Sequence, residues 1–138
     1  MGTSDLAKDL RLPAGSGLLH ALGHCVLAAR AHGVDIIDGV HVALDDDTGL
    51  EFACQQGRDL GFDGKSLIHP RQIAVANECF GVTPAAAKAA REIITAWRAA
   101  RNDGHGITLL NGQLIEQLHV DEAERLLALY SATHELRE

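Results

Sequence analysis

The feature that most constrains the fold is a pair of short β-branched stretches separated by one helix. Residues 36–42 and 65–68 are typical of buried strands, and the stretch 48–60 between them is predicted to be helical. Two strands joined through a helix form a right-handed parallel unit. A parallel sheet is normally covered on both faces, which two strands cannot do for themselves. The pattern therefore predicts an α/β chain whose sheet is completed by further strands or by a partner chain.

The first half of the chain carries four local signals. Segments 2–6 and 9–17 contain the small, acidic and helix-breaking residues typical of loops. Apolar residues recur at helical spacing over 18–31, with Gly33 placed to end that helix. A capping box at Thr48, with Glu51 three residues later, predicts where the next helix begins.

The second half begins with a helical region over 71–81, followed by a restart at Thr83-Pro84 that has an N-cap threonine before a proline. That helix is expected to end at Gly104. Asn111-Gly112, flanked by apolar residues, predicts a hairpin over 107–118, and the last helix is expected to begin near Asp121.

Composition limits the class of protein. The 138 residues suffice for one ordinary domain, and 46% hydrophobic with 22% charged residues is a globular composition. A net charge of −7 argues against a nucleic-acid partner. We expect no signal peptide and no membrane span, because no apolar run is long enough. Three widely spaced cysteines favour reduced thiols and a cytoplasmic location.

Two further patterns resemble metal sites only superficially. His20 and His24 have helical i, i+4 spacing but lack the glutamate of a zinc-protease motif, so we interpret them as a surface pair. The run 45–47 is all aspartate, and it is better explained as a solvated turn that begins a helix.

Four segments carry a resemblance to a known family. Residues 61–73, Gly-Phe-Asp-Gly-Lys-Ser-Leu-Ile-His-Pro-Arg-Gln-Ile, closely resemble the last-strand signature of the citrate lyase beta-subunit family, within the HpcH/HpaI aldolases. Residues 2–6 are similar to the loop after the sixth barrel strand, and 37–40 to the seventh strand. Residues 111–120 are similar to the C-terminal lid. The four segments occur in the family's order.

The resemblance implies a TIM (β/α)8 barrel, which in full is about 250 residues. Residues 1–104 would be the C-terminal part of the barrel, namely the end of strand six with strands seven and eight. Residues 105–138 would be the lid hairpin and helix. Counterparts of strands one to five, and of most of six, do not occur within these 138 residues.

Family members cleave a 3-hydroxyacyl thioester, usually of CoA, to an acetyl thioester and an oxo acid. Mg²⁺ suits this chemistry as a hard, oxygen-binding Lewis acid. The resemblance implies that Asp5 is a metal ligand, although a solvated loop or capping acid is the simpler interpretation of an isolated aspartate. The partner glutamate and the arginine that polarises the thioester would lie in the missing strands, so the Mg²⁺ site is expected to be incomplete.

Three other residues acquire substrate roles from the resemblance. Ser4 would contact the substrate carboxylate, unless it is a plain turn serine. Ile68 and His69 match a segment that contacts the acyl thioester, but a strand end closed by His-Pro explains them equally well.

Glu116 matches an acidic lid residue that reaches a neighbouring subunit's active site, where it would transfer a proton to or from the acetyl methyl group. Several relatives carry aspartate there. The alternative is an exposed hairpin carboxylate.

The sequence thus predicts the C-terminal portion of a Mg²⁺-dependent carbon–carbon lyase acting on a malyl-, citramalyl- or citryl-type thioester, and inactive alone. The alternative is a non-catalytic remnant or oligomerisation module of the same family. Expected partners are an acyl-CoA substrate in the complete enzyme, and either further copies of the chain or a complementing N-terminal half.

Overall fold

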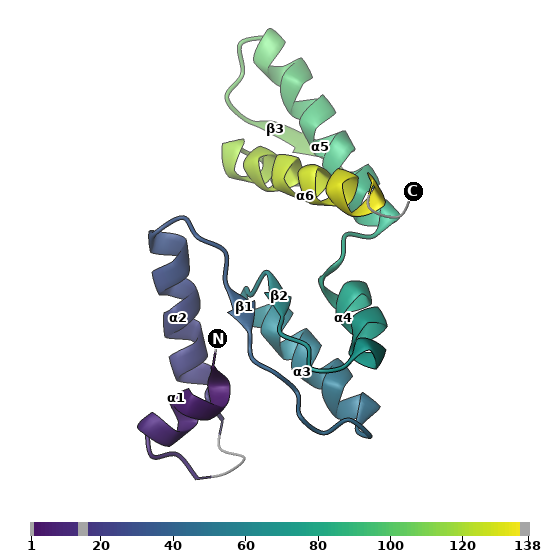
Figure 1. Ribbon diagram of the computed structural model, residues 1–138. Helices are drawn as coiled ribbons and strands as arrows, with labels where there is room; N and C mark the ends of the chain where they lie inside the picture. Colours follow the sequence, from purple (N-terminus) through teal and green to yellow (C-terminus); the bar gives the residue numbers. More distant parts are fainter. Residues whose placement is uncertain (1, 14–16, 136–138) are drawn as a thin grey trace. The chain divides into compact units, whose positions relative to one another are not determined.

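The computed structural model describes residues 2–13 and 17–135, with the side chains of the last two excepted (Figure 1). Residues 14–16 of the expected loop, and Met1, lie outside these ranges. The chain divides into two compact units, Met1–Phe80 and Gly81–Glu138. The first unit contains, in order, α1 (Thr3–Asp9), α2 (Leu19–Ala31), β1 (Ile37–Asp38), α3 (Asp47–Leu60), β2 (Gly64–Lys65), the 3₁₀ turn η1 (Pro70–Gln72) and α4 (Ile73–Phe80).

The β1–α3–β2 unit confirms the predicted parallel pairing. Ile37 lies opposite Gly64 and Asp38 opposite Lys65. Two further backbone bonds extend the pairing, from Asp63 N–H to Ile36 O and from Ser66 N–H to Asp38 O. The strands are nevertheless shorter than the predicted 36–42 and 65–68, because each has one partner strand within the described part of the chain and the backbone diverges beyond it.

Residues 3–9 form the helix α1, so the prediction of a loop over 2–6 was wrong, and the described residues before it contain no strand end. Asp5 in the first turn and Lys8 in the last turn both complement the helix dipole. Thr3 packs against Gly39, just after β1, where any Cβ would overlap the threonine side chain. Glycine at 39 is what lets the start of α1 lie at the carboxyl end of β1.

The cap of α3 is Asp46, and not the predicted capping box at Thr48. Asp46 Oδ1 accepts a hydrogen bond from Gly49 N–H at 2.9 Å. A Cβ at 49 would collide with the Asp46 carboxylate, so glycine there permits the cap. The helix ends at Gly61, whose φ of +94° is the left-handed conformation that glycine adopts without strain.

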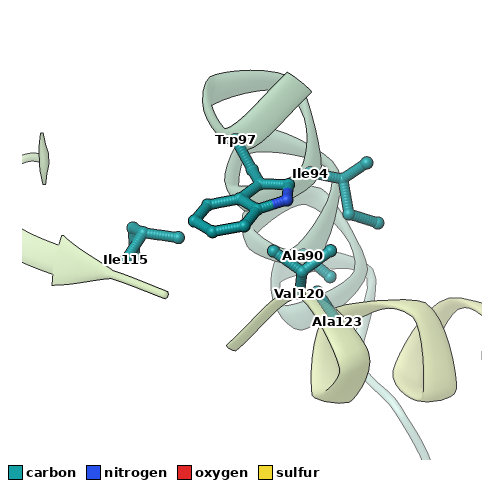
Figure 2. Close-up of a cluster of buried hydrophobic side chains, with 6 residues drawn as sticks. All are labelled: Ala90, Ile94, Trp97, Ile115, Val120 and Ala123. Carbon is teal, nitrogen blue, oxygen red and sulfur yellow. The ribbon is translucent and has the colours of Figure 1, made fainter. Parts of the chain in front are cut away.

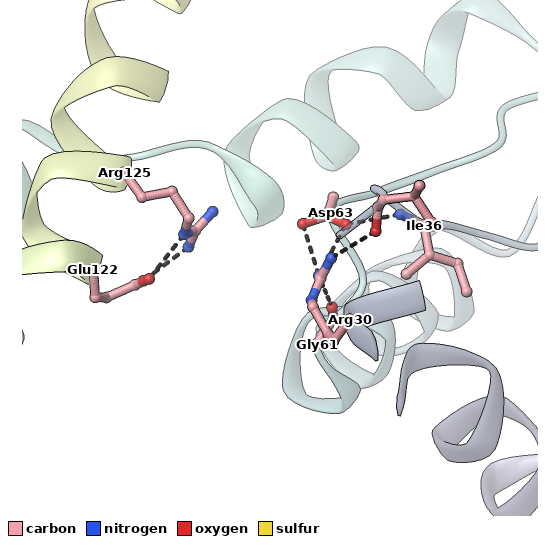
Figure 3. Close-up of polar contacts among 7 residues, drawn as sticks. Arg30, Ile36, Gly61, Asp63, Glu122 and Arg125 are labelled. Carbon is pink, nitrogen blue, oxygen red and sulfur yellow. Dashed lines mark hydrogen bonds and ion pairs between the residues drawn. The ribbon is translucent and has the colours of Figure 1, made fainter. Parts of the chain in front are cut away.

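The amino ends of β1 and β2 are joined by one aspartate. Asp63 accepts Ile36 N–H at 2.8 Å and both oxygens accept from Arg30 of α2, at 2.8 and 2.9 Å (Figure 3). Arg30 also donates to Gly61 O at 2.7 Å. These hydrogen bonds connect the C-terminal end of α2 to the amino ends of β1 and β2. The helices pack through two apolar clusters, one of Leu22, Val26 and Phe62 and one of Leu50, Cys54 and Ala76.

The second unit contains α5 (Pro84–Asn102), β3 (Thr108–Leu110), β4 (Gln113–Ile115) and α6 (Gln117–Glu135). The predicted start of α5 is confirmed, since Thr83 Oγ1 accepts Ala86 N–H at 3.1 Å and Pro84 follows the cap. Figure 2 shows the core of this unit, in which Trp97 of α5 lies among side chains of both helices and the hairpin. The buried cluster is Ala90, Ile94, Trp97, Ile115, Val120 and Ala123.

The hairpin is confirmed, with Leu110 opposite Gln113 and the turn at Asn111-Gly112 in the left-handed region, φ +51° and +79°. The last helix begins at Gln117 and not near Asp121. Val120 lies in the first turns of this helix and is buried in the same cluster as Trp97, so the earlier start of the helix adds an apolar residue to the core.

The boundary between the two compact units falls at 80/81. The division into a barrel part over 1–104 and a lid over 105–138 stays a prediction. Helix α5 shares its core with β4 and α6. It therefore groups with the hairpin.

Several apolar side chains of the β1–β2 region face outward. Ile37 is 42% exposed, Val42 69% and Ile68 50%. No helix within the described ranges is long and apolar enough to cross a membrane.

Candidate functional site

A buried ion pair lies at the carboxyl ends of β1 and β2. Lys65 Nζ contacts Asp38 Oδ2 at 2.7 Å, and the two side chains are 3% and 9% exposed. Asp38 Oδ1 accepts Gly39 N–H at 2.7 Å, so both carboxylate oxygens are satisfied. The pair joins the two strands through side chains at the register position where their backbones also pair.

The surroundings of this pair are built by α3. Gly57 faces the Asp38 carboxylate, and a Cβ there would lie 2.9 Å from Oδ2. Cys54, one turn earlier, is fully buried. Burial raises the pKa of the Cys54 thiol, and Lys65 partly opposes that rise. The thiol is therefore neutral at physiological pH.

Gln72 joins the two segments that follow the strands. Its side chain is 2% exposed, its Nε2 donates to His41 O at 2.9 Å, and its Oε1 accepts Ile68 N–H at 3.0 Å. His41 follows β1 and Ile68 follows β2. One buried amide therefore sets the spacing of two loops at the strand ends, which is the edge where barrel active sites lie.

The predicted substrate residues Ile68 and His69 are on the loop that Gln72 holds. Both are exposed. His69 Nδ1 accepts Arg71 N–H at 3.2 Å and caps η1. With Nδ1 acting as acceptor, the proton of a neutral imidazole is on Nε2, which is left as a donor.

Ser4 and Asp5 lie in the first turn of α1, and both are exposed. The Thr3–Gly39 contact places this turn beside the end of β1. The Asp5 carboxylate has no hydrogen-bond or ion-pair partner among the described residues. The first unit thus carries Ser4 and Asp5 beside the end of β1, and Ile68 and His69 on the loop after the neighbouring strand β2.

Glu116 belongs to the second unit, immediately before α6. Its backbone N–H donates to His119 Nδ1 at 3.1 Å, and its carbonyl accepts His119 N–H at 3.0 Å. The Glu116 carboxylate has no hydrogen-bond or ion-pair partner among the described residues. It is half-buried.

The described residues contain no group of three or more His, Cys, Asp or Glu side chains able to hold a metal ion. His20 and His24 are exposed, with ring centroids 4.3 Å apart. Asp45 and Asp47 both pair with Arg71, at 3.3 and 3.1 Å. Asp5 is an oxygen ligand of the kind that Mg²⁺ prefers.

Sequence reasoning missed Lys65, Gln72 and His119. Lys65 and Gln72 both lie within the 61–73 signature, which was the available signal. His119 is three residues after Glu116, the spacing of a capping box with histidine in place of glutamate or glutamine.

A parallel strand–helix–strand unit with polar side chains at its carboxyl edge is an α/β arrangement. The family model described as HpcH/HpaI aldolase/citrate lyase matches residues 1–70. The chain belongs to this family.

The relatives are enzymes of CoA thioesters and citrate. The chain is 46% identical over 131 residues to the (3S)-malyl-CoA thioesterase of Cereibacter sphaeroides, covering 93% of this chain and 46% of that protein. It is 38% identical over 132 residues to the citrate lyase subunit beta of Leuconostoc mesenteroides subsp. cremoris, covering 96% and 43%. The chain therefore spans a little under half the length of these relatives.

Solved structures share the fold. CitE from Mycobacterium tuberculosis, solved in complex with magnesium, acetoacetate and coenzyme A, matches with a TM-score of 0.76 and 25% identity, covering 94% of this chain and 50% of that one. A citrate lyase from Burkholderia xenovorans matches with a TM-score of 0.69, covering 83% of this chain and 35% of that one, with 22% identity. The described strands form two separate two-stranded sheets and no closed barrel.

Proposed function

We propose that this chain is the C-terminal portion of a Mg²⁺-dependent carbon–carbon lyase. The substrate would be a 3-hydroxyacyl-CoA of the malyl, citramalyl or citryl type, and the products acetyl-CoA and an oxo acid. In this proposal β1 and β2 are strands seven and eight of a TIM barrel, and the second unit is largely the lid. The supporting observation is that the family signature carries exposed Ile68 and His69 at the carboxyl edge of a parallel pair, with Asp5 near the same edge.

Each candidate residue has a distinct role. Asp5 is a ligand of the metal, and Ser4 contacts the substrate carboxylate. Ile68 and His69 contact the acyl thioester, with His69 Nε2–H available as a donor to an oxygen atom. Glu116 moves a proton at the acetyl methyl carbon, for which an unpaired carboxylate is suited.

Magnesium, when bound, would polarise the substrate oxygens. Because this chain offers Asp5 without a second ligand, we expect it to bind Mg²⁺ alone in the millimolar range or not at all. Calorimetry with MgCl₂ tests this. Micromolar binding that disappears in Asp5→Ala would show that another ligand has been recruited.

Hydrolysis is a second candidate reaction. It is favoured by the 46% identity to proteins named (3S)-malyl-CoA thioesterase, which exceeds the 38% identity to a citrate lyase beta subunit. The two reactions have different products from (3S)-malyl-CoA. Cleavage of the carbon–carbon bond releases acetyl-CoA and glyoxylate, whereas hydrolysis of the thioester releases malate and free CoA.

The non-catalytic alternative is an assembly module. The lyase and the assembly module both require that another chain covers the β1–β2 sheet, because Ile37, Val42 and Ile68 are exposed. Burial of each of these side chains would contribute roughly 1.5–3 kcal/mol. The chain is therefore expected to self-associate or to pair with a complementing N-terminal half. Sedimentation at low micromolar concentration gives its mass. A cooperative, concentration-independent monomer contradicts both forms of association.

Complementation with an N-terminal half distinguishes the proposed lyase from the non-catalytic assembly module. The chain is co-expressed with the part of the Cereibacter sphaeroides relative that precedes the aligned region, and the purified complex is supplied with Mg²⁺ and (3S)-malyl-CoA. Free thiol, acetyl-CoA and glyoxylate are then measured. The lyase proposal predicts acetyl-CoA and glyoxylate in equal amounts, lost in Asp5→Ala and Glu116→Gln. A stable complex that turns over no substrate would support the module instead.

A further inference from the structure

The backbone N–H of Glu116 donates a hydrogen bond to the side chain of His119. Glu116 occupies the N-cap position of α6 and His119 is the third residue of that helix. In a capping box the third residue accepts the N-cap N–H through a glutamate or glutamine side chain. Here His119 Nδ1 makes that bond, at 3.1 Å.

This arrangement differs from a complete capping box in one respect. In the complete motif the N-cap side chain turns back to the helix and bonds the N–H of the third residue. His119 N–H instead bonds the Glu116 carbonyl, at 3.0 Å. The cap is therefore made through the backbone of Glu116, and the Glu116 carboxylate makes no hydrogen bond to the start of the helix.

The His119 imidazole also faces a groove lined mainly by apolar side chains. His119 lines a groove of about 330 Å³ between α5 and α6. The α5 side of the groove is lined by the apolar residues Ala86, Ala89, Ala90 and Ile93. Glu122, the charged residue of the lining, is engaged by Arg125 at 2.8 Å (Figure 3), and this hydrogen bond lowers the pKa of Glu122. Glu122 therefore stays ionised and bound to Arg125.

We propose that His119 is a positioning residue for Glu116, fixing the N-cap backbone through Nδ1 so that the carboxylate projects unpaired from the start of α6. The catalytic part of this inference rests on the proposed function of Glu116. The positioning part rests on the geometry of the chain alone, and the two are tested separately.

The first test is amide hydrogen exchange at Glu116, measured by NMR on the 138-residue chain. His119→Leu removes the acceptor, and exchange at Glu116 should accelerate about five- to tenfold, the order expected for one net hydrogen bond. His119→Asn places an acceptor oxygen the same number of bonds from the backbone as Nδ1, so it should restore slow exchange. Asparagine has a lower helix propensity than leucine. Slower exchange at Glu116 in His119→Asn than in His119→Leu would therefore not result from a more stable helix.

Two controls isolate the effect. The Ala86 amide, bonded to Thr83 Oγ1 in the same unit, should exchange equally in all variants. His105→Leu, at an exposed histidine after α5, should leave Glu116 unchanged. Equal exchange at Glu116 in wild type and His119→Leu overturns the positioning role.

The second test uses the complemented complex. His119→Leu should lower kcat several-fold with little change in KM, and His119→Asn should recover most of the loss. Accelerated exchange with an unchanged kcat would show that the cap is structural only. A complex inactive with wild-type chain would refute the proposed reaction, and with it the catalytic part of this inference, while the exchange result still decides the cap.

Discussion

Lys65 Nζ lies 2.7 Å from Asp38 Oδ2 in a part of the first unit from which solvent is almost excluded. Each charge is stable there only because the other is present, since an unpaired buried charge loses its hydration without compensation. Removing one partner should therefore be more harmful than removing both.

Lys65→Met is expected to lower the free energy of unfolding by about 3–5 kcal/mol. The double variant Asp38→Leu/Lys65→Met should lose less than either single variant. Urea unfolding of the four proteins measures this. Lys88→Met, which breaks an exposed pair with Glu92, is the control and should cost less than about 1 kcal/mol. Additive losses in the double variant would contradict a mutually dependent pair.

Gln72→Leu keeps roughly the side-chain volume and removes both hydrogen bonds. Ile68 N–H and His41 O would then lose their partner, at a cost of about 1–3 kcal/mol. Ile68 amide exchange should also rise, because its acceptor is gone. Gln55→Leu serves as control, since Gln55 is exposed and its side chain bonds Asp59 and the Cys79 thiol. Wild-type exchange at Ile68 in Gln72→Leu would show that the loop is fixed by other contacts.

Gly112→Ala tests the hairpin turn. Gly112 has φ +79°, where a Cβ introduces strain, so the substitution should destabilise the second unit by about 1 kcal/mol. Gly106→Ala is the matched control, because a Cβ there meets no atom within 4 Å and its φ is not positive. Thermal unfolding compares them. Equal melting temperatures would count against a turn that requires glycine.

Cys54 should resist alkylation at pH 8 for two reasons, because it is fully buried and because burial raises its pKa. Iodoacetamide labelling followed by peptide mass spectrometry should find Cys54 modified after Cys25, which is partly exposed. In denaturant all three cysteines should react together. Rapid labelling of Cys54 in the folded chain would refute its burial.

The same pKa shift predicts a pH dependence of stability. Below the ordinary thiol value of 9.0, Cys54 is neutral in both folded and unfolded chains. Above it the unfolded chain ionises first, so the free energy of unfolding should fall as pH rises from about 9 toward the higher folded pKa. Cys79, whose pKa burial also raises, adds to this fall. The double variant Cys54→Ala/Cys79→Ala should show a shallower alkaline decline in urea titrations.

Elements specified by neighbouring residues could be predicted from the sequence. Thr83-Pro84 and Asn111-Gly112 each carry their own conformational requirement, so the start of α5 and the hairpin turn were placed correctly. The parallel pairing of β1 and β2 followed from the helix that joins the two strands.

Features that depend on contacts between residues far apart in the sequence could not be predicted from it. Asp46 and Thr48 are both good caps two residues apart, and space at Gly49 favours Asp46. Gln72 bonds a carbonyl 31 residues away, so its role appears only once the strands are paired. The roles of Ser4, Asp5, Ile68, His69 and Glu116 came from family resemblance, and they stay predictions.

The side-chain bonds that join the carboxyl ends of β1 and β2 connect residues between Asp38 and Gln72. Asp38 with Lys65, and Gln72 with His41 and Ile68, are contained in this one stretch. A partner that covers the sheet would therefore meet loops already in place, and little further conformational entropy would be lost on association. Association should then proceed as rigid docking with an on-rate limited by orientation, without the slow phase expected when folding accompanies binding.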